Sequence, residues 1–449
     1  MLNADTIHVP GDYPTIQQAI DVSVNGDTIL VSLGIYYESI KFNGKGITVR
    51  SAEGPEVTFL IPIPSNPAIL VENDEGPDTV IDGFTIKGGN VSAGGAAIHC
   101  QGSSPTILNN IITENNSYTG SAISCNESSA TIEHNKFSLN FSASIDCREG
   151  GSPIIENNYF YGINNAAVRC HINTSPIINK NIIYDCNQWG ILCDWSNAII
   201  SNNVICYSGS SGIRCNGDIA PKIINNTILA NLIGIVCDNC SPIITNTILW
   251  ANYPEEIHTY LSAKPVVSYC DVMGGYTGSN NIDLDPQCIE IYGGDLHIAY
   301  NSPCRDAGDN NAVTELYDFE GDPRIAWNGT VDIGADEFYT HLYCTGDFNP
   351  DGSIEGKLIG LPGTTPTALF IGTDIRETPV PTPYGDFYLL PPRILVPLTA
   401  IPANGVLSLP TTVPTLPGPP YDIPVQGLVG LDSDSLTNLC VLEIRALEP

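Results

Sequence analysis

The segment Ala96-Ala97-Ile98-His99-Cys100 is the first of seven similar segments, each of which ends in cysteine. Successive cysteines are separated by 25, 22, 23, 23, 22 and 22 residues. They are Cys100, Cys125, Cys147, Cys170, Cys193, Cys215 and Cys237. A period of this length indicates a repeat architecture, in which each unit buries its apolar face only against its neighbours.

Within each repeat, apolar residues alternate with polar ones, as in Ala97 to Gln101. This period of two predicts short strands with one buried face. Two or three strands in about 22 residues, repeated in register, predict an all-β parallel solenoid whose coils stack ~4.8 Å apart. We therefore expect the cysteines to point inward as buried thiols, because their neighbours on each strand are polar.

A second column of the repeat is asparagine, ten or eleven residues after each cysteine. Its members are Asn110, Asn135, Asn158, Asn181, Asn203 and Asn226, followed by Thr247. Asparagine is favoured at bends, and stacked amides can bond to one another along a column. We interpret the column as an internal amide ladder; the alternative is that these residues are only polar turn formers.

The first segment contains Ile7-His8-Val9-Pro10, Tyr13 to Ile20 and Gly26 to Val31, and a later one reads Ile81-Asp82-Gly83-Phe84-Thr85-Ile86. With the repeats, these segments make residues 5–340 resemble the right-handed parallel β-helix proteins of the pectate-lyase-like superfamily. The resemblance implies a cap in which Thr15 begins a short helix that covers the first coil. The resemblance implies the fold but not an activity, because the coils contain neither of the family's hydrolase signatures, an Asp-Asp pair and a Gly-His-Gly motif.

The sequence predicts three parts: a cap with the first coils over 1–60, a right-handed parallel β-helix with a closing segment over 61–340, and a β-sandwich over 341–449. Proline is frequent in the last part, where short apolar runs alternate with turns. It resembles the β-sandwich modules of secreted bacterial proteins. Asp347, Asn349 and Asp351 have the spacing of a calcium loop, although Leu358 in the twelfth position favours a plain turn.

The net charge of −32 excludes a nucleic-acid partner, which requires a basic surface. The sequence contains no run of 18 apolar residues, so we expect no transmembrane segment. The acidic, lysine-poor and turn-rich composition is typical of a secreted or cell-surface protein. No cofactor is required by any motif, and calcium is the one candidate ion.

Residues on either side of each ladder cysteine are expected to point outward and to stack in two columns. These columns hold the densest group of ionisable side chains, and we take as candidate catalytic residues Asp146, Arg148, Arg169, His171, Asp194 and Arg214. The candidate carbohydrate-binding residues are Trp189, Trp195 and His99. A polysaccharide lyase would use arginine to neutralise a uronate and His171 as base, whereas a glycoside hydrolase would use Asp146 and Asp194. A face of mutually neutralised charges is the third interpretation.

Another outward face is largely apolar and is expected to be covered, by the sandwich, a second subunit or a glycan. Its members include Tyr159, Tyr161, Ile182, Tyr184 and Trp250. Two functions therefore remain open. The first is a protein that binds, and as an enzyme would cleave, an extracellular polysaccharide; the second is a structural surface protein, such as a rod, a filament subunit or an adhesin, that self-assembles through this face and the sandwich.

Overall fold

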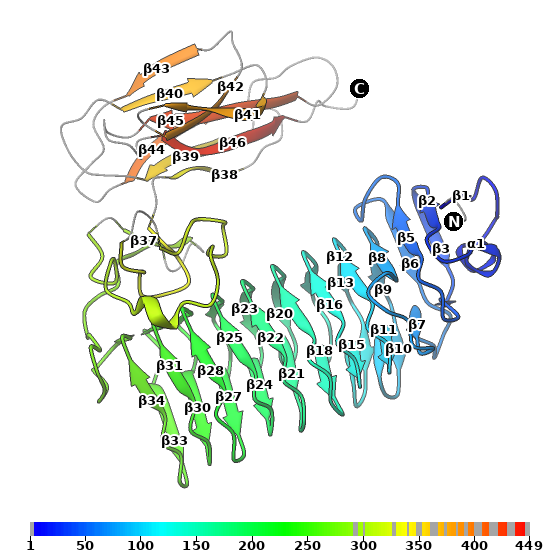
Figure 1. Ribbon diagram of the computed structural model, residues 1–449, viewed down its shortest axis with the longest axis horizontal. Helices are drawn as coiled ribbons and strands as arrows, with labels where there is room; N and C mark the ends of the chain where they lie inside the picture. The colour runs from blue at the N-terminus through cyan, green and yellow to red at the C-terminus, as the bar shows by residue number, and fades with distance from the viewer. Residues whose placement is uncertain are drawn as a thin grey trace. The chain divides into compact units, whose positions relative to one another are not determined.

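A computed structural model describes residues 4–290, 295–299, 301–325 and 329–338, together with strand backbones between 341 and 444. The chain divides into two units. The first comprises Met1–Pro286 and Asp306–Asp336, and the second comprises Gln287–Arg305 and Glu337–Pro449. The first unit is a right-handed solenoid of parallel strands, whose rungs follow one another from the blue to the green end of the chain in Figure 1.

Three parallel sheets, here called A, B and C, form the walls of the solenoid. Sheet A has twelve strands, which sets the number of rungs at about twelve. Its strands are β1 (Thr6–Val9), β2 (Thr28–Val31), β5 (Thr48–Ser51), β8 (Val80–Asp82), β12 (Thr106–Leu108), β16 (Thr131–Glu133), β19 (Ile154–Glu156), β22 (Ile177–Asn179), β25 (Ile199–Ser201), β28 (Lys222–Ile224), β31 (Ile243–Thr245) and β34 (Val266–Ser268).

Sheet B has eleven strands, which begin just after the strands of sheet A in each rung. They are β3 (Gly34–Tyr37), β6 (Thr58–Ile61), β9 (Thr85–Lys87), β13 (Ile111–Thr113), β17 (Lys136–Ser138), β20 (Tyr159–Ile163), β23 (Ile182–Cys186), β26 (Val204–Cys206), β29 (Thr227–Leu229), β32 (Ile248–Trp250) and β35 (Asp271–Val272). A short additional pair lies beside them, β10 (Asn90–Val91) with β14 (Asn116–Ser117).

Sheet C has ten strands and carries the cysteine column. They are β4 (Ile40–Lys41), β7 (Ile69–Val71), β11 (Gly95–Gln101), β15 (Ser121–Asn126), β18 (Ala143–Arg148), β21 (Val168–Cys170), β24 (Trp189–Asp194), β27 (Ser211–Asn216), β30 (Ile233–Asp238) and β33 (Glu255–Tyr260). Cysteines pair with cysteines in register from Cys100 to Cys237. All seven are fully buried in the core, so the predicted inward direction is confirmed.

The asparagine column forms the predicted internal ladder. Each side-chain Nδ2 donates to Oδ1 of the next rung, from Asn110 through Asn135, Asn158, Asn181 and Asn203 to Asn226, at 2.9–3.1 Å. The residue before each ladder asparagine is the one in the left-handed region, for example Lys180 with φ of 56°. The residue in the left-handed region makes the bend. The ladder asparagine that follows it provides hydrogen-bond partners for the backbone groups at that bend.

A second amide ladder, which the sequence analysis did not identify, lies at the bend between sheets B and C. Asn115 bonds to Asn140 in one stretch, and Asn231 bonds to Asn252 in another. The two stretches are separated by three rungs, in which Ile163, Cys186 and Ser208 are buried instead. Because the column is interrupted, its period is much weaker in the sequence than that of the first ladder.

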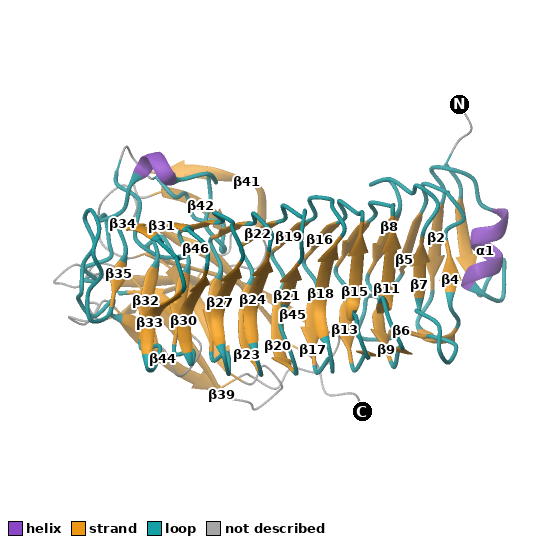
Figure 2. Ribbon diagram, turned by 90° about the horizontal axis from the view of Figure 1, so that it is seen from below, coloured by secondary structure: helices purple, strands orange, loops and turns teal. Residues whose placement is uncertain are grey.

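Helix α1 (Ile16–Val22) closes the N-terminal end of the solenoid (Figure 2). Thr15 is its N-cap, and its side chain accepts a hydrogen bond from the Gln18 backbone at 3.2 Å. Ile16, Ala19 and Ile20 are buried against the first coil. The predicted cap is thus confirmed, and it covers strand edges that would otherwise be open.

The closing segment of the first unit, residues 306–336, contains one short helix, η1 (Asn310–Ala312). The segment returns to sheet B, where Ala335 N donates to Thr227 Oγ1 at 2.9 Å and Gly334 N to Asn246 O at 2.9 Å. Arg324, buried within it, donates to the carbonyl oxygens of Ala335 and Gly334 at 3.1 and 2.8 Å. These bonds hold the segment on the solenoid wall.

In the second unit, β36 (Cys288–Glu290) pairs antiparallel with β37 (Asp295–Ile298). The remaining strands also pair antiparallel, in sheets of three, four and two. They are β38 (His341–Gly346), β39 (Ser353–Ile359), β40 (Thr367–Ile371), β41 (Ile375–Thr382), β42 (Gly385–Leu389), β43 (Ile394–Leu398), β44 (Val406–Thr412), β45 (Tyr421–Leu428) and β46 (Leu436–Ile444). Their connections lie outside the described residues, so the sandwich and the three-part division of the chain stay predictions.

Candidate functional site

Four of the predicted catalytic residues come together on the outer face of sheet C. Asp146 and Arg148 flank Cys147 on β18, and Arg169 and His171 flank Cys170 on the next strand, β21. Because Asp146 pairs in register with Arg169, the two flanking pairs lie opposite each other on neighbouring rungs. Alternation along the strands directs all four side chains away from the core.

The four side chains form one cluster around the carboxylate of Asp146. Arg148 Nε donates to Asp146 Oδ2 at 2.7 Å, and Arg169 Nη2 donates to the same oxygen at 2.9 Å. His171 Nε2 lies 2.9 Å from Asp146 Oδ1. The Asp146 side chain is fully buried beneath these partners, whereas the side chains of Arg148, Arg169 and His171 are 38%, 17% and 28% exposed.

The cationic neighbours keep Asp146 ionised. Burial on its own would raise the pKa of Asp146, but the contact with His171 and the charges of Arg169 and Arg148 outweigh it, so the pKa falls below its ordinary value. The cluster carries a net positive charge, because two arginines face one carboxylate. The atoms that reach solvent are therefore cationic, on a chain whose net charge is −32.

The arginine head groups have second anchors in the turn that precedes β15. Arg148 Nη2 donates to Thr119 O at 3.1 Å, and Arg169 Nη2 donates to Gly120 O at 2.6 Å. A Cβ atom on Gly120 would lie 2.0 Å from the carbonyl oxygen of Gly94, so glycine is required there. The sequence offered no signal for these two anchors, because turn carbonyls are not marked by residue type.

The other two predicted catalytic residues do not join the cluster. Asp194, at the end of β24, accepts a hydrogen bond from Asn216 Nδ2 at 2.7 Å. Arg214 on β27 forms a separate pair with Asp238, with Nη2 3.3 Å from Oδ2. Both pairs lie further along sheet C and are spaced from Asp146 by intervening rungs.

The predicted carbohydrate-binding residues are spread over the same sheet. Trp189 begins β24 and is half-buried, whereas Trp195 follows its end and is 49% exposed. His99, on β11, accepts a hydrogen bond at Nδ1 from Gly95 N at 3.3 Å. Burial lowers the pKa of His99, against the opposing charge of Glu72. These residues lie on or beside β11 and β24, on other rungs than the cluster.

The predicted apolar face follows the outer side of sheet B. Tyr159 and Tyr161 on β20 are exposed, and Tyr161 stacks on Tyr184 of β23 with ring centroids 5.8 Å apart. Ile182 and Trp250 are partly buried.

Further along this face, Thr227 and Ile248 are buried where the closing segment returns to the solenoid. At this end of the face the cover is the closing segment, which the sequence analysis did not consider; covering of the remaining face by the sandwich, a second subunit or a glycan stays a prediction.

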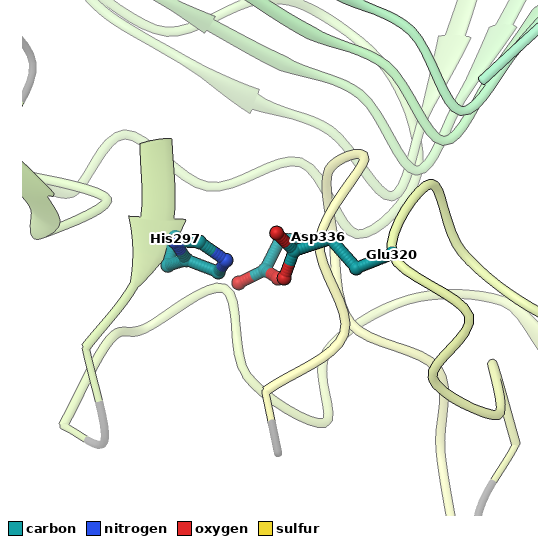
Figure 3. Close-up of side chains that lie close together, drawn as sticks. All are labelled: His297, Glu320 and Asp336. Atoms are coloured by element: carbon teal, nitrogen blue, oxygen red, sulfur yellow. The ribbon is translucent and has the colours of Figure 1, made fainter. Parts of the chain in front are cut away.

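The calcium-loop candidates Asp347, Asn349 and Asp351 lie outside the described residues. In the closing segment, Glu320 and Asp336 have carboxylate oxygens within 4.8 Å of each other (Figure 3). Two neighbouring carboxylates are common without an ion, so this pair carries no metal assignment. Among the described residues, no helix is long and apolar enough to cross a membrane.

The sequence comparisons agree with the observed fold. A family model described as a right-handed β-helix region matches residues 67–197, a range that includes the whole Asp146 cluster. The first unit is accordingly a right-handed parallel β-helix. A comparison of the sequence with curated proteins gives no match.

Several solved structures are similar to the chain at low identity. The enzymatically active domain of tailspike protein 2 of bacteriophage CBA120 is 12% identical, with a TM-score of 0.39, over 99% of this chain and 77% of that one. A PL6 family alginate lyase, AlyGC, is 14% identical, with a TM-score of 0.35, over 63% and 54%. Tailspike protein gp49 of an Acinetobacter baumannii bacteriophage, a capsular polysaccharide depolymerase, is 10% identical, with a TM-score of 0.32, over 100% and 85%.

Proposed function

We propose that the protein is a secreted or cell-surface protein that binds an anionic extracellular polysaccharide on sheet C and cleaves it by elimination. The observation that carries the proposal is the Asp146 cluster, in which three partly exposed basic side chains surround one buried carboxylate. A carboxylate-bearing sugar is the ligand that such a surface selects, because guanidinium groups bind carboxylates with charge-assisted hydrogen bonds.

The geometry favours elimination over hydrolysis. A glycoside hydrolase needs two carboxyl groups that reach the glycosidic bond. Asp146 is fully buried beneath three basic side chains, so its carboxylate cannot reach a glycosidic bond as nucleophile or activate water as general base. Asp194 lies outside the cluster. An elimination needs instead a cation beside the uronate carboxylate and a base for the proton on the adjacent carbon.

Arg169 and His171 have the properties that these two roles require. Arg169 is held by Asp146 and Gly120, so its guanidinium is fixed before substrate arrives. A His171 that keeps its proton on Nε2, toward Asp146, has its lone pair on Nδ1 for the substrate proton. The electron pair of the broken C–H bond forms a carbon–carbon double bond, and the glycosidic oxygen leaves and takes a proton from water. Asp146 is then a positioning residue.

The test is a panel of uronate-containing and neutral polysaccharides, with ultraviolet absorbance of the unsaturated product as the readout. His171→Ala is expected to lose cleavage and keep binding, whereas Arg169→Ala is expected to lose both. Arg214→Ala is the matched control, because this arginine lies on the same sheet and pairs elsewhere. Unchanged activity in both cluster variants would remove the assigned site.

Self-assembly is the second candidate, and the exposed tyrosines of β20 favour it. Tyr159 and Tyr161 leave an aromatic surface on sheet B, separated by β23 and β26 from the part that the closing segment covers. A rod or filament subunit of this kind is expected to give ordered multimers by electron microscopy. A single monomeric species in light scattering at high protein concentration would exclude it.

A further inference from the structure

The last rung of sheet C carries a glutamate where the earlier rungs have very small side chains. The position directly before the inward isoleucine or valine is small in seven successive rungs and then becomes Glu256. The small residues are Ala97, Ala122, Ser144, Ala167, Gly190, Gly212 and Gly234. In Glu256 a long acidic side chain is buried at a site where the solenoid otherwise admits none.

Glu256 takes the place of the next amide in the second ladder. Where an asparagine precedes it in that ladder, Oδ1 accepts both the backbone N–H and the side-chain Nδ2 of the preceding rung, as Asn252 does for Asn231 at 2.8 and 2.9 Å. Glu256 Oε1 accepts from Asn252 N at 3.1 Å, and its Oε2 accepts from Asn252 Nδ2. Both donors are neutral, and within the described part of the chain Glu256 forms no ion pair.

Glu256 is among the residues that line a pocket of about 440 Å³. Its other walls include Tyr253, which is 79% exposed, and Pro254, Met273 and Tyr276. All of these residues belong to the first unit. The pocket therefore combines a buried acidic group with aromatic and apolar walls and has the volume of a small-molecule site.

The ionisable groups around the pocket are mostly acidic. Burial raises the pKa of Glu256 to about 7, although the hydrogen bonds from Asn252 lower it and the charge of Asp271 raises it. Asp271 is itself fully buried on β35, and Asp283 Oδ1 accepts a hydrogen bond from Gly274 N on the pocket wall at 2.9 Å. On β33, Glu255 is in contact with His258. A buried carboxylate with only neutral donors is incompletely compensated, and a cation from solution would supply the missing charge.

We propose that this pocket binds a small organic ammonium ion, with the ammonium group on Glu256 and the body of the ligand against Tyr253 and Tyr276. Aromatic walls favour an organic cation through cation–π attraction. A calcium ion is disfavoured, because it takes six to eight oxygen ligands and Glu256 is the one buried carboxylate that lines the pocket. The site lies at the last rung, apart from the Asp146 cluster, and does not depend on the proposed lyase activity.

The test uses benzylamine as probe and benzyl alcohol, its neutral counterpart of similar shape, in titration calorimetry of the whole protein. Benzylamine is expected to bind at pH 8 and about 30-fold more weakly at pH 5.5, because Glu256 is then mostly protonated. Glu256→Gln keeps a side chain of the same size without the charge and is expected to weaken binding at pH 8 at least about tenfold. Arg169→Ala, in the other site, is expected to leave binding unchanged.

Tyr253→Ala is a second variant. It changes a side chain that is mostly exposed, so it does not alter a buried position. It is expected to weaken benzylamine binding several-fold. The proposal is overturned if benzylamine fails to bind at millimolar concentration at pH 8, if benzyl alcohol binds equally well, or if calcium displaces benzylamine. Unchanged affinity in a folded Glu256→Gln protein would overturn it as well.

Discussion

Arg169 faces Asp146 across neighbouring strands of sheet C, and its Nη2 donates to the Oδ2 of a carboxylate that is completely buried. The carboxylate therefore depends on its basic partners for compensation, while the partners depend on it for their positions. Removing the acid and removing a base should have different consequences, because one leaves two partly exposed cations together and the other leaves a buried anion with fewer partners.

The first prediction concerns Asp146→Asn. The substitution keeps the shape of the side chain but leaves Arg148, Arg169 and His171 without a counter-charge. We expect a loss of roughly 2–3 kcal/mol in the free energy of unfolding, less than for a wholly buried pair because the arginines reach solvent. Urea denaturation of the whole protein measures it. Asp194→Asn, outside the cluster, is the control and should cost less than about 1 kcal/mol; equal losses would contradict the central role of Asp146.

The second prediction concerns the first amide ladder. Asn181 accepts from Asn158 and donates through Nδ2 to Asn203 Oδ1 at 2.9 Å, to Ile155 O and to Asn179 O. Asn181→Ala leaves several buried polar groups without a hydrogen-bond partner at once, and each such group costs ~1–3 kcal/mol. We expect a total loss of at least about 3 kcal/mol in thermal or chemical unfolding.

An exposed asparagine provides the control for this variant. Asn187 Nδ2 donates to Asn164 Oδ1 on the neighbouring rung at 2.8 Å, at the surface. Asn187→Ala should change stability by no more than about 0.5 kcal/mol, because water replaces the lost partner. If the two substitutions destabilised the protein equally, the stabilising effect of the ladder would not come from its burial.

The fold follows from the sequence because its two strongest columns report two different physical requirements. Cysteine at a constant step marks an inward position with room for a small apolar side chain, and asparagine marks the bend that must satisfy backbone groups. Once strands pair in register, Asp146 necessarily faces Arg169 on the next rung. The sequence could therefore predict which residues of the cluster lie opposite each other, because strand register alone determines this.

The burial of several residues could not be predicted, because it depends on contacts that no local sequence pattern indicates. Asp146 is buried because Arg148 of its own strand and Arg169 of the next rung cover it, and these two side chains are held by Thr119 and Gly120. Thr227 is covered by Ala335, which is 108 residues away in the chain. In the sequence, nothing distinguishes Glu256 from an ordinary exposed acid. It turns inward because it lies on the last rung of sheet C, where its side chain accepts a hydrogen bond from Asn252.

The third prediction concerns the buried thiols. The seven ladder cysteines are fully buried, so iodoacetamide cannot reach them; two further buried cysteines, Cys186 and Cys206, have a pKa that burial raises to about 12, so their reactive thiolate is scarce. We expect these cysteines to resist iodoacetamide in the native protein and to react after unfolding, as measured on peptides by mass spectrometry. A thiol placed at the 89% exposed Tyr118, by Tyr118→Cys, should react rapidly in the native state. Labelling of the ladder at the same rate would refute the inward assignment.

The last prediction is a pH dependence of stability that comes from Glu256. Burial raises the pKa of Glu256 from 4.5 to about 7, so the folded protein holds a proton that the unfolded chain releases between these two values. Where the folded state binds more protons, stability falls as pH rises. The Glu256 contribution should therefore favour folding below about pH 4.5 and be lost as pH rises to about 7.

Comparison of the wild-type protein with Glu256→Gln isolates this contribution, because other groups titrate in both. The difference between their unfolding free energies should change across pH 4.5 to 7 and become constant above and below that range. The wild-type protein should lose stability relative to the variant as pH rises. A difference that does not vary with pH would show that Glu256 ionises with an ordinary pKa and that its carboxylate is solvated, and a change of opposite sign would show that the Asn252 hydrogen bonds outweigh its burial.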